Sequence, residues 1–304
     1  MELTDEEILS TISEHTSSEA MRLAHWLRNI RYNEENFGFR KTLADLPASP
    51  WPKGLVLGAG PAFKRLGMKP LVNLLNTSKV TVFACDGALP TLAETGYAPD
   101  YVTSVDAHPV VANFYRRCFD LLNWGSKTKF LLSTTVHKDV VDTILDSGSH
   151  RDDIYWWQPF WPDELEPAFR RHGLTQLNTG GNVGTTSYII AAVVQKLSPI
   201  GLMGLEFSWS DETPLVDTQY FAQIMKVVGE DPKKARKMFK VVKNERDGKN
   251  YVADPVYYAY WLMFKELWGL LPSEVRDRTY NLTREGILDA PGLRTITTEG
   301  FAKL

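Results

Sequence analysis

The sequence predicts an α/β protein with a Rossmann-like, mainly parallel sheet flanked by helices, and with helical appendages at the N- and C-termini. Two observations carry this prediction. Short apolar segments alternate with segments of helical periodicity between residues 54 and 206, which is the pattern of consecutive βαβ units. Glycine-rich turns and aspartates directly follow several of the apolar segments, at the strand ends where open α/β sheets bind ligands.

Residues 1–50 are expected to form a helical appendage. Thr4 and Glu7 match a capping box, and apolar residues from Ile8 to Ile30 recur at helical spacing. Three prolines between residues 47 and 52 break this pattern. We therefore place a boundary at residue 50, before the apolar strand that follows.

Residues 51–225 are expected to form a nucleotide-binding core. Its predicted strands are Leu55–Leu57, Val80–Cys85, Tyr101–Val105, Phe130–Thr134, Ile154–Trp157 and Ile200–Glu206. Its predicted helices lie near Lys69–Leu75, near Leu89–Thr95 and over Gly184–Leu197. The alternation predicts a mainly parallel sheet of at least six strands.

Residues 226–304 are expected to complete the fold with basic and aromatic helical regions. The stretch 226–249 is rich in Lys and Arg and is interrupted by Asp231, Pro232 and Gly248. This composition favours a solvated helix over a catalytic lid. Aromatic residues at helical spacing from Tyr257 to Trp268 predict packing in the core or at an interface, not a cofactor-binding surface.

Composition narrows the classes of partner. A formal net charge of −3 over 304 residues argues against a nucleic-acid-binding protein and favours a small-molecule partner. The longest apolar runs, such as Tyr188–Val194, are far shorter than the ~20 residues of a membrane helix, and we expect a cytoplasmic protein without a membrane partner. Cys85 and Cys118 show no metal-ligand spacing, which argues against zinc or a disulfide framework. The sequence leaves open whether the chain forms a homo-oligomer.

The first candidate phosphate-binding turn contains Gly58 and Gly60. It follows a short apolar strand, so its backbone amides could approach a phosphate closely. A glycine turn that only the path of the chain requires is the alternative. The third glycine of the dinucleotide fingerprint would fall at Phe63, and no acidic residue stands where that motif places its ribose ligand. A NAD-dependent dehydrogenase is therefore disfavoured.

A second candidate anion site lies at the start of the helix predicted over residues 184–197. Consecutive glycines precede hydroxyl side chains there, and free amides at a helix N-terminus suit phosphate oxygens. A glycine-rich turn with a threonine cap is the alternative. The loop lacks the lysine of a Walker A motif, so a triphosphate would need a metal ion or distant basic residues. The candidate ligand-binding residues are Gly180, Gly181, Asn182, Gly184, Thr185 and Thr186.

Asp86 and Asp106 each follow an apolar, β-like run, so both are expected at one rim of the sheet. Mg²⁺ prefers one or two carboxylates together with phosphate oxygens and water. The glycine turns therefore favour a Mg²⁺-nucleotide site with these aspartates as metal ligands, although either could instead cap the turn that follows it. His108 is a candidate for contacting phosphate or accepting a proton, with a plain surface position before Pro109 as the alternative.

These segments resemble the 6-hydroxymethylpterin diphosphokinase MptE-like family, which also includes motility accessory factors linked to flagellin glycosylation. The matching segments are Leu57–Pro61, Cys85–Ala88, Ala98–Val102, Ser104–Asp106, Gly180–Thr186 and Gly204–Ser208. The Asp-Gly and Pro-Asp segments are also similar to those of thiamine pyrophosphokinase, which performs the same type of transfer. The resemblance adds Gly87 and Glu206 to the candidate nucleotide-binding residues.

Two departures from the family pattern bear on the site. Relatives usually carry Asp at the position of Glu206, although a Glu could still reach a metal or a ribose hydroxyl. The tail 280–287 resembles a segment of the motility factors, with Arg284 and Glu285 displaced from that pattern. The tail therefore favours a resemblance to the glycosylation branch of the family.

The resemblance implies a Mg²⁺-dependent diphosphotransferase that moves pyrophosphate from the co-substrate ATP to 6-hydroxymethyl-7,8-dihydropterin and releases AMP. Asp86 and Asp106 would then hold Mg²⁺ and His108 would help to deprotonate the alcohol, while alignment and charge neutralisation supply most of the catalysis. Two alternatives stay open. One is a glycosyltransferase of the motility accessory factor type that transfers sugar from a nucleotide to an acceptor, and the other is a non-catalytic nucleotide-binding accessory protein.

Overall fold

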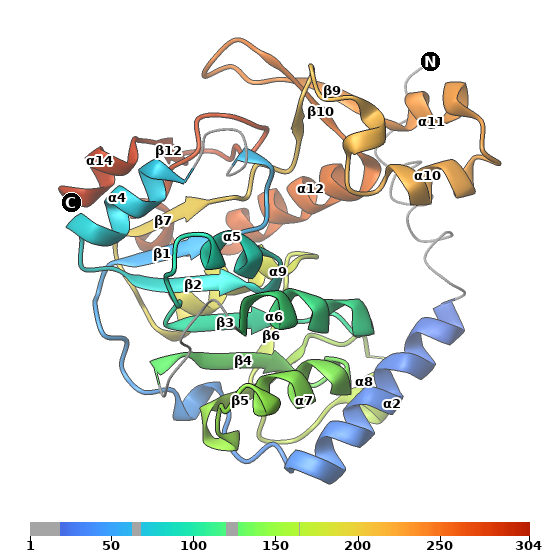
Figure 1. Ribbon diagram of the computed structural model, residues 1–304, viewed down its shortest axis with the longest axis vertical. Coiled ribbons are helices and arrows are strands. Elements are labelled where there is room, and N and C mark those ends of the chain that lie inside the picture. The colour runs from blue at the N-terminus through green and yellow to red at the C-terminus, as the bar shows by residue number, and fades with distance from the viewer. Residues whose placement is uncertain (1–18, 63–67, 120–126, 164) are drawn as a thin grey trace.

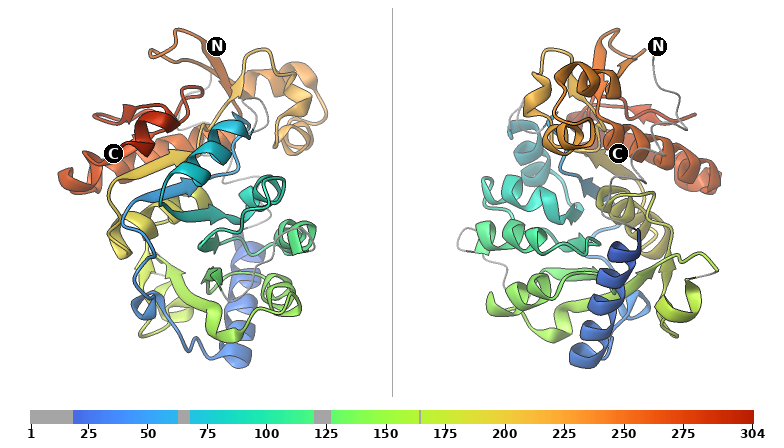
Figure 2. Two further views of the ribbon diagram at one scale, coloured as in Figure 1. Left: turned by 60° about the vertical axis from the view of Figure 1, so that its left-hand side comes forward. Right: turned by 90° about the vertical axis from the view of Figure 1, so that its right-hand side faces the viewer.

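The computed structural model describes residues 19–62, 68–119, 127–163 and 165–304. The expected capping box at Thr4 and Glu7 lies outside these residues, as does Phe63. The described chain forms three layers, with helices on both faces of one large sheet (Figures 1 and 2). This arrangement confirms the predicted Rossmann-like α/β class.

Within the described residues, nine strands form the large sheet, and every neighbouring pair is parallel. They are β1 (Gly54–Leu57), β2 (Thr81–Cys85), β3 (Tyr101–Ser104), β4 (Lys129–Ser133), β5 (Ile154–Pro159), β6 (Gln176–Leu177), β7 (Ile200–Met203), β11 (Thr279–Asn281) and β12 (Arg294–Thr295). Their order across the sheet is β12-β11-β7-β1-β2-β3-β4-β5-β6. The chain builds outward from β1 to β6 and then returns to the other side of β1 with β7. The carboxyl ends of β1 and β7 therefore flank the topological switch point.

Helices cover both faces of the sheet, which explains why β1 and β2 are buried along their whole length. One face carries α4 (Lys69–Thr77), α5 (Leu89–Ala93), α6 (Ala112–Phe119), α7 (Lys138–Asp146) and α14 (Thr298–Ala302). The other carries α9 (Val183–Ile189), which continues as a π-helix to Val194, and α12 (Pro255–Leu270). Two short helices, α8 (Glu166–Phe169) and α13 (Ser273–Arg276), lie in connections. Apolar cores lie between the sheet and each of the two helical layers.

The N-terminal helix α2 (Glu19–Phe37) lies beside the carboxyl ends of β3 and β4 (Figure 1). Its Asn33 side chain donates to the carbonyl oxygens of Thr134 and Val136, at 3.0 and 2.9 Å. Asn29 donates in the same way to Thr135 at 2.9 Å. The helical N-terminal appendage is therefore confirmed, and it is attached by buried hydrogen bonds to the end of the sheet that carries the candidate residues.

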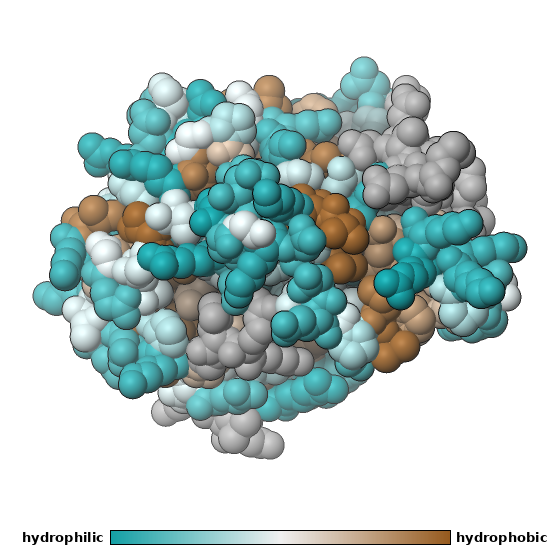
Figure 3. Space-filling view, turned by 90° about the horizontal axis from the view of Figure 1, so that it is seen from above, coloured by the Kyte–Doolittle hydropathy of each residue, from teal (hydrophilic) through white to brown (hydrophobic). Residues whose placement is uncertain are grey.

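The basic stretch 226–249 differs from the predicted solvated helix. Asp231 caps only the short helix α11 (Pro232–Met238), after which β9 (Lys240–Lys243) pairs with β10 (Asn250–Ala253) in an antiparallel hairpin. With α10 (Phe221–Val227) and β8 (Trp209–Ser210), these elements enclose a small apolar core of their own. The surface over this end of the molecule is largely hydrophilic, with small apolar patches (Figure 3). The prediction missed the hairpin because its strands are only four residues long and because the two adjacent valines between Lys240 and Lys243 do not show the alternation typical of a strand.

Strand boundaries and strand number also differ from expectation. The strand expected over 200–206 ends at Met203, because Gly204 adopts a left-handed φ of 79° that turns the chain. β6, β11 and β12 are two or three residues long, too short to show a period. The expected boundaries at residues 50 and 225 stay predictions, although β11 and β12 show that the C-terminal region contributes to the main sheet.

The aromatic helix α12 packs into the core, as its spacing predicts. Its Trp268 ring stacks 6.5 Å from the ring of Tyr188 in α9, and Phe264 lies 6.3 Å from the same ring. These three side chains are at most 1% exposed. Despite its apolar character, neither α12 nor another described helix is long and apolar enough to cross a membrane.

We predict that Trp268→Ala lowers the free energy of unfolding by ~3–5 kcal/mol, because a large aromatic side chain leaves a buried cavity. Leu270→Ala, two residues along the same helix, is the matched control. Its side chain is 76% exposed, so its loss should change the free energy of unfolding by less than ~0.5 kcal/mol. Urea unfolding followed by circular dichroism measures both, and equal effects would contradict the described packing of α12.

Candidate functional site

The candidate residues gather where β1, β2, β3 and β7 end, at the carboxyl edge of the sheet on the right-hand side of Figure 1. Parallel strands bring their carboxyl ends to one edge, so residues that are far apart in sequence meet there. The helix α2 and the excursion of α10 and α11 lie on the same side of the molecule (Figure 1). The site is therefore built on rigid strand ends between two helical regions.

The turn after β1 is held tightly against the segment that follows β7. The amide of Gly58 donates to the carbonyl of Met203 at 2.8 Å, and that of Gly60 donates to Gly204 at 2.7 Å. A Cβ at Gly58 would stand 2.3 Å from the Gly204 oxygen. The glycines are thus required by close approach of two backbones, and both of their amides already have partners. Their role in binding phosphate stays a prediction that these hydrogen bonds do not support.

Glu206, in the segment after β7, holds this turn by hydrogen bonds. Its carboxylate accepts from the amide of Gly204 at 3.0 Å and from that of Ala62 at 3.4 Å. A Cβ at Gly60 would stand 1.9 Å from one of its oxygens. The side chain is 2% exposed, and burial raises the pKa of its carboxyl. In this structure Glu206 therefore occupies the turn that a phosphate was expected to fill.

Asp86 is the buried acid at the end of β2. Its Oδ1 accepts from the amide of Gly87 at 2.7 Å and its Oδ2 from the hydroxyl of Ser104 at 2.8 Å. The Tyr115 hydroxyl lies 2.8 Å from that of Ser104. Burial raises the pKa of Asp86 to about 7, and the nearby charge of Asp106 adds to the increase. Sequence reasoning missed Ser104 and Tyr115, and the one available signal was a hydroxyl at the last position of an apolar strand.

Asp106 and His108 lie in the exposed loop after β3. An oxygen of Asp106 accepts from the amide of His108 at 2.9 Å, and Nδ1 of His108 accepts from the amide of Val110 at 3.1 Å. The carbonyl of Ala107, between them, is held by the Asn29 side chain of α2 at 3.2 Å. Both candidates thus also stabilise their own loop, and α2 anchors it beside Asp86.

The residues of the 180–186 loop serve mainly to shape the start of α9. Gly180 and Gly181 adopt left-handed φ angles of 54° and 78° and lie against α12, where a Cβ on Gly181 would meet Met263. Asn182 caps α9 by accepting from the amide of Thr185 at 2.9 Å. The hydroxyls of Thr185 and Thr186 are buried and hydrogen-bonded within the loop.

Gly184 differs from its neighbours because its backbone packs against the segments at the switch point. A Cβ there would stand 3.0 Å from the side chain of Leu205, which also abuts Gly58. A Cβ on Gly87 would in turn stand 2.9 Å from Ala59, in the turn after β1. The structure therefore brings Gly58, Gly60, Gly87, Gly184 and Glu206 together at the edge where Asp86 lies. Gly180, Gly181, Asn182, Thr185 and Thr186 are instead used within their loop.

Aromatic residues of α12 stand beside the acids, and sequence reasoning assigned them to packing alone. Burial raises the pKa of the Tyr257 hydroxyl, and the nearby Asp254 and Glu206 carboxylates add to the increase. Burial also raises the pKa of Tyr260, with a further contribution from Asp106. The rings of Trp209 and Tyr257 stack at 5.8 Å with 9° between their planes. Tyr260 and Trp209 are only partly buried and therefore provide some flat apolar surface near the carboxyl edge.

The site is strongly acidic. Asp254, which caps α12, is a further fully buried acid, and burial raises its pKa to about 6. Within the described part of the chain, neither Asp86, Asp106, Glu206 nor Asp254 forms an ion pair with Lys or Arg. A cation supplied from outside would therefore relieve unpaired negative charge at this edge.

The donor set around Asp86 fits Mg²⁺ that arrives with phosphate. Asp86 and Asp106 act on each other electrostatically, and a divalent ion between acids would favour their ionised forms. Among the described residues, no group of three His, Cys, Asp or Glu side chains could enclose a metal ion. Mg²⁺ needs only one or two carboxylates when phosphate and water complete its shell. The residues present therefore suit a metal-nucleotide complex and not an all-protein metal site.

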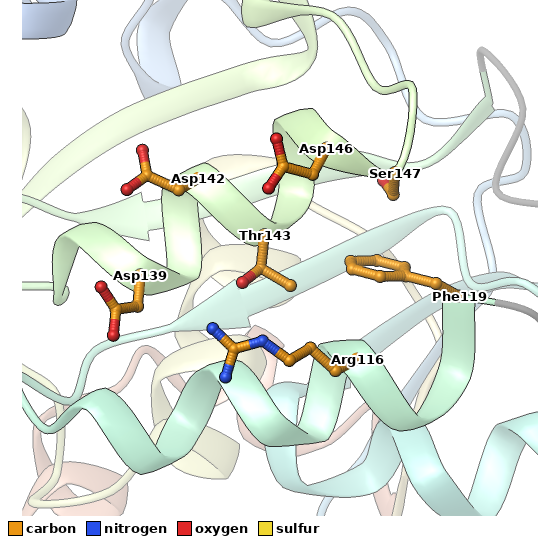
Figure 4. A pocket seen from close by; sticks show the side chains of 7 residues that line it. All are labelled: Arg116, Phe119, Asp139, Asp142, Thr143, Asp146 and Ser147. Carbon is orange, nitrogen blue, oxygen red and sulfur yellow. The ribbon is translucent and has the colours of Figure 1, made fainter.

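A separate surface pocket lies between α6 and α7 (Figure 4). Arg116 and Phe119 reach into it from α6, and Asp139 and Asp142 from α7, with the guanidinium of Arg116 directed toward Asp139. None of the candidate residues lines this pocket. It is therefore distinct from the group of candidate residues.

The fold and the carboxyl edge of the sheet define a Rossmann-like α/β protein with acids near the switch point. The chain belongs to the 6-hydroxymethylpterin diphosphokinase MptE-like family, whose profile matches residues 24–212. The match confirms the family resemblance read from the sequence, and the family is one of nucleotide-related transferases.

Among solved structures, the chain is similar in fold to the MAf glycosyltransferase from Magnetospirillum magneticum AMB-1. The TM-score is 0.61 at 12% sequence identity, over 90% of this chain and 39% of that one. The chain thus spans well under half of that protein. No curated protein matches the sequence significantly.

We predict that Gly60→Ala destabilises the protein by ~1–3 kcal/mol or more, because the added methyl group collides with Glu206 and with the Gly204 carbonyl. Gly269→Ala in α12 is the matched control, since a Cβ there meets nothing within 4 Å. It should leave stability unchanged or raise it by up to ~1 kcal/mol. Urea unfolding midpoints compare the two, and a fully stable Gly60→Ala variant would show that the turn is not packed against β7.

We predict that Asp86→Asn stabilises the protein at pH 8. The pKa of Asp86 rises from 3.8 to about 7 on folding, so the contribution of this carboxyl to stability is fully present below pH ~4 and is lost as the pH rises through about 7. This shift of about three pKa units corresponds to a loss of at most ~4 kcal/mol of stability in the wild type. The amide of Asn is neutral at every pH, so the variant does not undergo this loss. Thermal unfolding between pH 4 and pH 8 measures the difference, with exposed Asp152→Asn as the control. A gap between variant and wild type that does not grow with pH would contradict the buried acid.

Proposed function

We propose that the carboxyl edge around Asp86 and Asp106 is the active site of a Mg²⁺-dependent diphosphotransferase. It would move pyrophosphate from ATP to the hydroxymethyl group of 6-hydroxymethyl-7,8-dihydropterin and release AMP. The observation that carries the proposal is the group of acids at the switch point, which lacks Lys or Arg ion-pair partners in the described chain. Such a site binds polyphosphate only together with a divalent cation.

The transfer requires one bond to form and one to break. The hydroxyl oxygen of the pterin attacks the β-phosphorus of ATP, and the bond from that phosphorus to the oxygen bridging to the α-phosphorus breaks. AMP leaves with the electron pair, and the hydroxyl proton passes to a base, for which His108 is the candidate. Mg²⁺, held by Asp86 and Asp106, would neutralise charge on the phosphates. The protein would contribute mainly alignment.

Two features of the edge support substrate positioning. The first-turn amides of α9 at Val183 and Gly184 lack partners within the helix and suit an anion. Tyr260 and Trp209 offer flat surface near the acids for a pterin or a nucleobase. The proposal thus uses groups from both halves of the fold.

A nucleotide-sugar glycosyltransferase is the second candidate. It is favoured by the similarity to a structure named as a glycosyltransferase, which extends over 90% of this chain and so beyond the residues that the family profile matches. In that reaction the same acids would hold a metal or orient the sugar while the nucleotide leaves. A non-catalytic nucleotide-binding protein is the remaining outcome of the test below.

The test combines purified protein, ATP, Mg²⁺ and 6-hydroxymethyl-7,8-dihydropterin, with detection of AMP and pterin diphosphate by chromatography. Asp106→Asn should lower kcat/KM by ~10²–10³-fold, because it removes charge stabilisation of the transferred group. Asp152→Asn, an exposed acid at the opposite edge of the sheet, is the matched control and should retain full activity. Full activity of Asp106→Asn would contradict the metal assignment.

Parallel reactions with nucleotide-activated sugars separate the two candidates. Pterin-dependent AMP release supports the diphosphotransferase. Release of a nucleotide from an activated sugar, without any AMP from ATP and pterin, would overturn it in favour of glycosyl transfer. Nucleotide binding without turnover in both sets of reactions would overturn both and leave an accessory role.

A further inference from the structure

Two buried hydroxyls behind Asp86 form a directed chain of hydrogen bonds. Ser104 Oγ donates to Oδ2 of Asp86 at 2.8 Å, and the Tyr115 hydroxyl lies 2.8 Å from Ser104 Oγ. An ionised carboxylate can only accept a hydrogen bond, so the Ser104 hydroxyl is the donor to Asp86. Tyr115 must then be the donor to Ser104. The chain of donors therefore runs from α6, through the last residue of β3, to the acid at the end of β2.

Packing in the core holds these hydrogen-bonded side chains in place. Ser104 and Tyr115 are both fully buried. The Tyr115 ring packs 6.2 Å from that of Phe130 in the core between α6 and the sheet. Burial raises the pKa of the Tyr115 hydroxyl well above its ordinary value, so it keeps the proton that it donates.

The hydrogen bonds to Asp86 also restrict rotation of its carboxylate. Gly87 N–H holds one oxygen at 2.7 Å and Ser104 holds the other at 2.8 Å, so rotation of the carboxylate plane would break one bond or the other. Each oxygen retains a second lone pair for a ligand. Asp106 has no comparable support, since it lies in an exposed loop and accepts from the amide of His108.

We propose that Ser104 and Tyr115 are positioning residues that hold the Asp86 carboxylate in the orientation needed to bind a divalent cation. Mg²⁺ tolerates little deviation from octahedral geometry, and partners that orient a metal-binding carboxylate usually determine much of its affinity. This inference rests on the proposed function, because it places the cation at Asp86. It adds to that function two side chains that touch neither substrate nor metal.

Mn²⁺ binding tests the inference without relying on turnover. Calorimetric titration and electron paramagnetic resonance would measure Mn²⁺ affinity with and without ATP. Ser104→Ala should weaken Mn²⁺ binding by ~10–100-fold, and Tyr115→Phe by about two- to tenfold, since it removes one hydrogen bond from the chain. Ser104→Thr keeps the donating hydroxyl and should bind Mn²⁺ as the wild type does.

The matched control is Thr103→Val, at the neighbouring position of the same strand. The Thr103 hydroxyl is buried and has no hydrogen-bond partner within the described residues, so its loss should not change Mn²⁺ affinity. Thermal unfolding of each variant separates a folding defect from a binding defect. Tyr115→Phe keeps the buried ring, so it tests the chain even if Ser104→Ala does not fold.

The outcomes separate this inference from the proposed function. Wild-type Mn²⁺ affinity in Ser104→Ala and Tyr115→Phe would overturn the positioning role, whichever reaction the protein performs. A wild-type protein that binds no Mn²⁺, with or without ATP, would overturn both the positioning role and the metal assignment. Mn²⁺ binding that depends on Ser104, without transfer to pterin, would support the positioning role while the diphosphotransferase proposal fails.

Discussion

The chain segments that follow β1 and β7 pass each other so closely that only glycine fits at the contact. Amides of the first segment donate to carbonyls of the second at 2.7 and 2.8 Å, and the Glu206 carboxylate fastens the turn across the switch point. This contact lies at the end of the β1–β7 pairing that joins the two halves of the parallel sheet, and β2 and β3 follow β1 in register. Glu206 is part of the contact, and Asp86 lies at the end of the neighbouring strand β2.

The same contact explains why this edge is acidic yet stable. Glu206 and Asp86 are both nearly fully buried, and among the described residues each accepts hydrogen bonds from backbone amides or a hydroxyl and not from a basic side chain. Neutral donors of this kind satisfy buried carboxylates without cancelling their charge. The fold thus supplies hydrogen bonds that retain the acids, while burial raises their pKa values, so a bound cation would favour their ionised forms.

The sequence predicts the sheet well and the site only in part, for physical reasons. Strands such as β1 and β2 are buried on both faces, so they appear as apolar runs, whereas β11 and β12 are too short to show a pattern. Asp86 could be predicted because it ends an apolar run. Tyr115 could not, since its contact with Ser104 joins two elements whose packing no local pattern reveals. The glycines at 180 and 181 resemble a phosphate loop because positive φ angles and anion sites both favour glycine.

The order of strands also bears on how the protein folds as it leaves the ribosome. Residues 24–212, which match the family profile, include β7 but not its outer neighbour β11, at Thr279–Asn281. Until those residues are synthesised, one edge of β7 has unpaired amides and carbonyls, and open edges of this kind invite pairing between chains. Leu282 and Phe301, which cover Gly201 of β7, arrive later still. Completion of the sheet must therefore wait until β11 and β12 have been synthesised, and products that stop before them should be prone to aggregation.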